Sequence, residues 1–205
     1  MISYSQPHLF PFLGLETSHP PKHIAQKYYL SWVDALWDTL PQLAVKKDDT
    51  ILLPDFYCLD VMDNMRIHGF KVATYPLDQN FQITYSRFIS IYKQIKPQVV
   101  ILFHACGITN KLVDNPQVIK LITKNSILIE DRVHQISDPE KLIIINDRHL
   151  ILDSLRKNIP LPGSFLYTTS KTGRTLSAPR QFTSSYGMRV TLYYYLYRTL
   201  LALGV

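Results

Sequence analysis

The sequence predicts an α/β protein, a three-layer α/β/α sandwich built on a mostly parallel sheet. Strand-like apolar runs alternate with helix-like segments through the middle of the chain, which is typical of a parallel sheet covered by helices. One such run, residues 126–130, stays apolar up to a pair of acids, as in a strand buried on both faces. With 46% hydrophobic and 19% charged residues among 205, the chain can bury one sizeable core.

The two ends of the chain differ from its middle. Residues 1–23 are predicted to be irregular because four prolines interrupt them: Pro7, Pro11, Pro20 and Pro21. From Ile24 to about Leu43, the apolar residues fit a buried helix. We expect the domain to occupy residues 24–180, with a loop of turn formers over 170–180, and a Tyr-rich terminal helix to follow over 181–205.

Between these ends, strand and helix signals alternate. Strands are predicted at 50–53, 71–75, 98–104, 126–130, 142–145, 150–152 and 164–168. Helices are predicted at 59–68, 85–95 and 116–123.

Composition and charge favour a cytoplasmic protein that binds neither nucleic acid nor membrane. The net charge of +6 is spread along the chain without basic runs, which favours a solvated surface over a nucleic-acid patch. Cys58 and Cys106 form neither a C-x-x-C pair nor a disulfide framework. No leader opens the chain, and Arg198 interrupts its longest late apolar stretch, so a helix packed on the domain is favoured over a membrane anchor.

Several common chemistries lack their defining motifs. No G-x-G-x-x-G, G-x-x-x-x-G-K-[ST] or G-x-S-x-G segment occurs, so the sequence does not indicate dinucleotide, P-loop or α/β-hydrolase chemistry. His19 and His23 have the spacing of a helical metal pair, but Pro20 and Pro21 lie between them, so no metal site is predicted.

An acid and a lysine, Asp131 and Lys157, are the residues that indicate a particular chemistry. Asp131 follows the apolar run, at the carboxyl end of a predicted strand, where open α/β sheets place their ligands. Lys157 lies on a predicted loop. Pyridoxal 5′-phosphate (PLP) chemistry requires a lysine to form the Schiff base and an acid to keep the pyridine nitrogen protonated.

The sequence around these residues resembles that of the DegT/DnrJ/EryC1/StrS family of fold-type I aminotransferases. The similar segments are Ile129–Gln135 and Ser154–Gly163, together with Asp49–Cys58 and Val99–Gly107 upstream. The resemblance implies the large domain of a PLP-dependent enzyme, mostly of amino-sugar biosynthesis. It also implies a nucleotide-sugar or other keto substrate, an amino donor and a homodimer.

The resemblance assigns a role to each matching residue. It makes Lys157 the catalytic Schiff-base lysine and Asp131 the partner of the pyridine nitrogen. His134 matches the position that hydrogen-bonds the phenolic oxygen of PLP, and Ser154 matches a serine that helps hold the phosphate. Tyr57 lies where the family places a side chain over the cofactor ring, and its neighbour Cys58 is the less favoured choice for this position.

Each assignment has a structural alternative. Lys157 can be a surface lysine, Asp131 a capping carboxylate, His134 a core histidine, Ser154 a turn serine and Tyr57 a core aromatic.

The chain also departs from the family pattern. Where the family opens its first long helix with a small and then a polar residue to bind phosphate, this chain has Trp32-Val33, and Asp34 adds a negative charge. Arg132-Val133 replaces small residues, and Gly163-Ser164 replaces paired glycines. The family's small C-terminal domain is not recognised in the sequence.

Three hypotheses therefore remain open. The first is a PLP-dependent aminotransferase, and the second is a catalytically inactive relative that serves as a dimerisation or binding module. The third, based on net charge alone, is a basic module for nucleic acid or anionic surfaces.

Overall fold

The computed structural model describes residues 20–135, 137–158 and 163–177, together with 192, 193, 195, 196, 199 and 200. The strands are β1 Ile24–Tyr29, β2 Thr50–Pro54, β3 Lys71–Tyr75, β4 Val99–Phe103, β5 Ile127–Asp131, β6 His149–Leu152 and β7 Ser164–Thr169. The α-helices are α1 Trp32–Gln42, α2 Leu59–Ile67, α3 Tyr85–Ile95, α4 Pro116–Asn125, α5 Leu155–Asn158 and α6 Ser170–Thr175. Two short 3₁₀ turns are η1 Ala105–Gly107 and η2 Pro139–Lys141.

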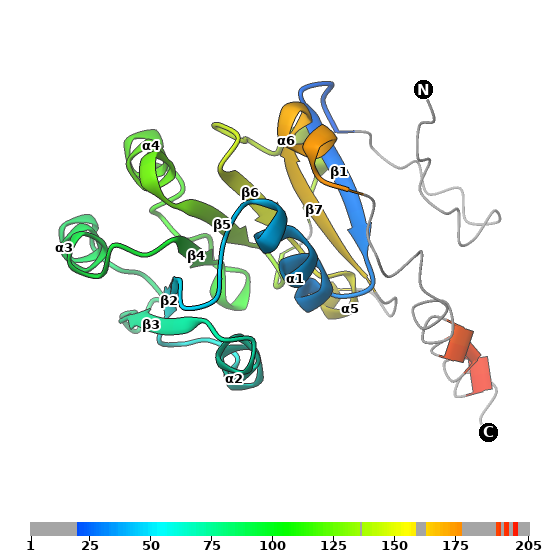
Figure 1. Ribbon diagram of the computed structural model, residues 1–205, viewed down its shortest axis with the longest axis horizontal. Coiled ribbons are helices and arrows are strands. Elements are labelled where there is room, and N and C mark those ends of the chain that lie inside the picture. Colours follow the sequence, from blue (N-terminus) through cyan, green and yellow to red (C-terminus); the bar gives the residue numbers. More distant parts are fainter. Residues whose placement is uncertain are drawn as a thin grey trace.

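The strands form one mostly parallel sheet in the order β1-β7-β6-β5-β4-β2-β3 (Figure 1). Every pairing from β3 across to β6 is parallel, whereas β7 is antiparallel to both β6 and β1. The parallel strands end at one edge of the sheet, and this edge gathers the residues that follow β2, β4, β5 and β6.

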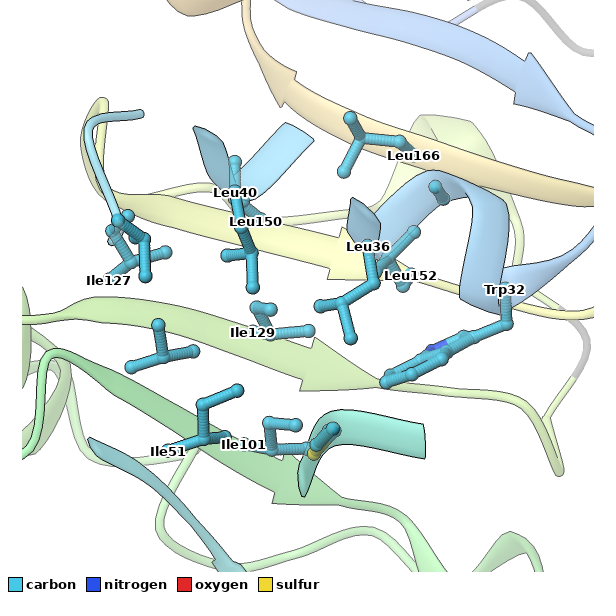
Figure 2. Packing of buried hydrophobic residues seen from close by; sticks show 14 of the residues in the cluster. Trp32, Leu36, Leu40, Ile51, Ile101, Ile127, Ile129, Leu150, Leu152 and Leu166 are labelled. Atoms are coloured by element: carbon cyan, nitrogen blue, oxygen red, sulfur yellow. The ribbon is translucent and has the colours of Figure 1, made fainter. Parts of the chain in front are cut away.

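Helices cover both faces of the sheet, which confirms the three-layer prediction. On one face, α1 and α2 pack against alternate residues of the central strands, including Ile101 and Ile129 (Figure 2). On the other face, α3 and α4 cover the intervening residues, including Leu102 and Leu128. The central strands are apolar without alternation because both of their faces are buried.

The predicted helix over residues 24–43 is wrong in its first part. Ile24–Tyr29 is a strand, β1, and it pairs residue by residue with β7. The helix begins only at Trp32, because Ser31 is its N-cap and the Ser31 hydroxyl accepts a hydrogen bond from the Asp34 N–H at 3.1 Å.

Two further predictions are wrong. Residues 142–145 are not a strand, and Leu142 is instead buried against side chains of the sheet, Ile24, Ile151 and Tyr167. The predicted loop over 170–180 begins with a helix, α6, which Thr169 caps by accepting the Thr172 N–H. Gly173 permits that helix to approach β1, because a Cβ there would lie 2.2 Å from the Ala25 Cβ.

The chain ends fall mostly outside the described residues. The predicted irregular segment 1–23 is described only from residue 20, and the six described residues of the predicted terminal helix are helical. In the described part of the chain, no helix has both the length and the apolar character needed to cross a membrane.

Candidate active site

Asp131 ends β5 at the carboxyl edge of the sheet and is only 1% exposed. Its Oδ1 accepts the Val133 N–H at 3.1 Å, and its Oδ2 accepts the Tyr57 hydroxyl at 2.5 Å. The pKa of Asp131 is raised from 3.8 to about 7, mainly by burial, and the Asp153 carboxylate contributes to the rise. The two hydrogen bonds and the charge of Lys157 offset part of that rise in the Asp131 pKa. A carboxyl group in this state responds strongly to a cationic partner.

Lys157 lies on α5, the short helix after β6, and its side chain is exposed. Its positive charge lowers the pKa of both Asp131 and His134, so the ammonium group lies close enough to influence both side chains. Within the described residues, no hydrogen bond or ion pair of the ammonium group is found. The structure thus brings together the lysine, the acid and the histidine that the sequence indicated.

His134 is held in a defined orientation. Its Nδ1 lies 3.2 Å from the Cys106 backbone N–H and accepts that hydrogen bond. Burial and the charge of Lys157 both lower the pKa of His134, which favours the neutral ring. A neutral ring that accepts at Nδ1 carries its proton on Nε2, so His134 offers one N–H donor to a ligand.

Ser154 immediately follows Asp153, the residue after β6, and is only 4% exposed. Among the described residues, its hydroxyl has no hydrogen-bond partner, although its carbonyl accepts the Lys157 N–H at 3.4 Å.

Tyr57 makes a contact that the sequence did not predict, because its hydroxyl donates to Asp131. Its ring also packs edge to face against Trp32 and Phe103, with ring centroids 6.4 and 5.2 Å apart. Whether Tyr57 covers a cofactor ring stays a prediction. What the contacts establish is that Tyr57 ties the residues after β2 to the end of β5.

The N-terminus of α1 differs from a glycine-type phosphate site. The Ser31 hydroxyl donates to the Asp34 carboxylate at 2.7 Å and accepts the Asp34 N–H, so one of the free N–H groups of the helix is already satisfied. The Trp32 side chain is buried, and its indole N–H has no hydrogen-bond partner among the described residues. A phosphate here would meet the Asp34 carboxylate as well as the remaining backbone donors.

A second polar cluster lies beside this site and was not predicted from the sequence. Glu130 is buried, with its carboxylate 3.1 Å from His104 Nε2, 3.3 Å from His149 Nε2 and 3.4 Å from Arg132 Nε. Although burial alone raises the pKa of Glu130, contacts with the two histidines lower it to about 2. The sequence held one signal of this cluster: an acid in an otherwise apolar strand needs a buried partner.

The side chains at the ring end of the site fit PLP. Asp131 would face the ring nitrogen, His134 offers a donor, Ser154 offers a hydroxyl, and Lys157 offers an amine beside them. The donor set also agrees with the chemistry of a lysine-linked cofactor. In the described residues, no cluster of three His, Cys, Asp or Glu side chains could hold a metal ion.

Solved structures share this fold. Kynurenine aminotransferase of Pyrococcus horikoshii is 16% identical, with a TM-score of 0.60 over 85% of this chain and 48% of that one. Histidinol-phosphate aminotransferase of Sinorhizobium meliloti, solved with pyridoxal-5′-phosphate, is 13% identical, with a TM-score of 0.57 over 78% and 48%. 3-Amino-5-hydroxybenzoic acid synthase is 10% identical, with a TM-score of 0.58 over 73% and 40%.

The fold is therefore that of the large domain of PLP-dependent aminotransferases. The sequence matches the family "Aminotransferase class I and II" over residues 9–192, and the chain belongs to that family. This confirms the expected aminotransferase relationship, while the narrower DegT/DnrJ/EryC1/StrS assignment stays a prediction. No curated protein matches the sequence. The chain spans about half the length of the solved structures that it matches.

Proposed function

We propose that this chain is the large domain of a PLP-dependent aminotransferase, with Lys157 as the Schiff-base lysine. One observation carries the proposal: Lys157 on α5 lies close enough to Asp131 and His134, at the end of β5, for its charge to lower the pKa of both. We further propose a nucleotide-sugar or related keto substrate, a separate amino donor, and a homodimer in the cytoplasm. The sequence segments that resemble the DegT/DnrJ/EryC1/StrS family support the sugar substrate.

Each residue has a task that follows from its surroundings. Asp131, held by Tyr57 and Val133, provides a carboxylate for the protonated ring nitrogen of the cofactor. His134 donates its Nε2–H to an oxygen, and Ser154 donates its hydroxyl. When bound, PLP supplies an electron sink for removing a proton from the carbon next to the substrate nitrogen.

Proton movement in this site falls to Lys157. Its exposed amine can reach a ligand at the carboxyl edge of the sheet, because no hydrogen bond within the described residues restrains it. An amine that has lost its proton can accept one from a carbon atom and return it to another.

The second candidate is a non-catalytic relative that keeps the fold as a dimerisation or binding module. The N-terminus of α1 favours it, since Asp34 and the bulky Trp32 stand where the family has a phosphate-binding turn. Loss of phosphate binding would weaken cofactor affinity even if every residue at the ring end were competent.

A labelling experiment separates the two candidates. The purified chain is incubated with PLP, its visible absorbance is recorded, and the adduct is reduced with borohydride and located by peptide mapping. We expect label on Lys157, loss of that label in Lys157→Ala, and retention in Lys171→Ala, an exposed lysine paired with Asp147. A folded protein without label on Lys157 would support the second candidate.

A parallel incubation with pyridoxal isolates the phosphate contribution. If the N-terminus of α1 binds phosphate, PLP labels Lys157 at lower concentration than pyridoxal does. If Asp34 repels phosphate, Asp34→Asn increases labelling by PLP and leaves labelling by pyridoxal unchanged.

A further inference from the structure

Asp153 is a buried acid that the proposed chemistry does not use. It follows β6 directly and precedes the segment that carries Lys157, and it is 5% exposed. Its Oδ1 accepts the Phe165 N–H at 2.7 Å, and its Oδ2 lies 3.3 Å from the Tyr167 hydroxyl, which donates to it. Both partners belong to β7, so the carboxylate bonds across to the strand at which that segment ends.

The backbone around Asp153 closes the same junction. The Asp153 N–H donates to the Phe165 carbonyl at 3.2 Å, and the Ser164 hydroxyl donates to the Asp153 carbonyl at 2.5 Å. The Leu155 N–H donates to the Gly163 carbonyl at 2.8 Å. Hydrogen bonds therefore join the first and last parts of the segment from Ser154 to Gly163.

The residue at the far side of this junction has little freedom. Gly163 has φ +131°, a conformation that favours glycine, and a Cβ there would lie 2.3 Å from Tyr28 Cε2. The start of β7 is thus fixed against β1. Because Asp153 is hydrogen-bonded to β7, it restrains the residues just before Lys157 relative to that strand.

Charge also connects Asp153 to the site. Burial raises the pKa of Asp153 to about 6, while the positive charge of Arg132 lowers it. The Asp153 carboxylate in turn raises the pKa of Asp131. Arg132, which departs from the family pattern, therefore provides a cation near both Glu130 and Asp153.

We propose that Asp153 is a positioning residue for Lys157: by fastening the end of β6 to Phe165 and Tyr167, it holds the lysine segment in reach of Asp131. The inference rests on the proposed function, in which Lys157 carries the cofactor. It concerns a residue that does not itself touch the reacting groups. Its distinctive requirement is an acceptor for the Phe165 N–H, and asparagine also supplies one.

Hydrogen exchange on the cofactor-free chain tests the fastening directly. Asp153→Ala removes the acceptor, and we expect exchange at Leu155, Lys157 and Phe165 to accelerate roughly tenfold relative to Leu52 and Val100 in the sheet centre. Asp153→Asn retains the acceptor and restores slow exchange. Asp147→Asn, at the other end of β6, serves as the matched control. A uniform acceleration at all amides in Asp153→Ala would overturn the proposal.

PLP labelling of the same variants tests the consequence for Lys157. We expect Asp153→Ala to lower the rate of borohydride-trapped labelling on Lys157 roughly tenfold, and Asp153→Asn to restore most of it. Labelling of Asp153→Ala at the wild-type rate would overturn the positioning role. If the wild-type chain itself is not labelled, the proposed function fails, and the exchange pattern alone decides whether Asp153 fixes the segment.

Discussion

Glu130 and Asp131 are adjacent buried residues of β5, and their side chains leave the strand toward opposite faces of the sheet. Glu130 contacts His104, His149 and Arg132, and its pKa falls to about 2. Asp131 receives only a hydroxyl and a backbone N–H, and burial raises its pKa to about 7. Similar burial therefore accompanies opposite pKa shifts, because His104, His149 and Arg132 lie against the Glu130 carboxylate, whereas the hydrogen bonds to Asp131 and the charge of Lys157 offset only part of its burial.

The comparison separates a structural acid from a functional one. Glu130 finds its partners within the chain, which joins β4, β5 and β6. Asp131 lies at the edge of the sheet where ligands bind, and its pKa stays raised. A cationic ligand group there, such as a protonated ring nitrogen, would stabilise its charged form. Four substitutions test this distinction, and they are given from the largest expected effect on stability to the smallest.

Glu130→Gln tests whether Glu130 is a structural acid. It removes the carboxylate that three buried or half-buried groups contact, and we expect a loss of about 3–5 kcal/mol in the free energy of unfolding at pH 7. Because the folded pKa of Glu130 is depressed, its contribution is present above pH 4.5 and is lost as the pH falls toward 2. Urea unfolding at several pH values measures both effects. Asp138→Asn, at an exposed ion pair, is the control and should change neither.

Asp131→Asn should change the free energy of unfolding in the opposite direction and stabilise the protein. The folded pKa of Asp131 is raised from 3.8 to about 7, so the native state holds an extra proton between these values and its stability falls as the pH rises through them. We expect the variant to be more stable than the wild type at pH 8 by roughly 2–4 kcal/mol and to lose that part of the pH dependence. Urea unfolding at pH 4 and pH 8 checks this, with Asp147→Asn as control. A lower stability at pH 8 would count Asp131 among the structural acids.

Tyr57→Phe sharpens the comparison by removing one of the two donors to Asp131. We expect a loss of about 1–2 kcal/mol at pH 8, because the Asp131 carboxylate loses a hydrogen bond in a buried place. The pKa of Asp131 should also rise, so the stability decrease extends to higher pH. Thermal unfolding across pH 5–9 measures both, and Tyr85→Phe, an exposed tyrosine at the start of α3, should leave both unchanged.

Lys157→Met should have the smallest effect on stability. Its side chain is exposed, so we expect the free energy of unfolding at pH 5 to change by less than about 0.5 kcal/mol. Because its charge lowers the pKa of Asp131, the variant should show a higher Asp131 midpoint, readable by NMR titration of the carboxyl carbon. Lys171→Met controls for the loss of a surface charge. An unchanged midpoint would place Lys157 too far from Asp131 for the proposed role.

Local patterns in the sequence predicted the centre of the fold well. The apolar runs at β2, β4 and β5 are buried on both faces, so each carries a strong signal of its own. β1 carries no such signal, because its ends alone are buried and its partner, β7, lies far along the chain. Residues 142–145 resemble a strand in composition, yet Leu142 packs onto side chains of the sheet and the segment joins no strand, which composition alone does not show.

The candidate site was predictable where chemistry and position coincide in one segment. Asp131 ends a buried strand and Lys157 lies in a recognisable motif, so the sequence puts both forward as candidates. The Tyr57 hydroxyl on Asp131 and the Asp153 bonds to β7 join residues distant in sequence, and no local pattern records them. The contacts of Glu130 were missed for the same reason.

The sheet order has a consequence for how the chain is made. β7 lies between β1 and β6, so in the described sheet β1, its first strand, has no neighbour until β7, its last strand, has left the ribosome. Strands β2 to β6 can assemble earlier, since their parallel pairings involve only one another. A nascent chain stalled before Ser164 would hold Asp131 and Lys157 on an unfinished sheet, and completion of β7 would be the step that makes the site whole.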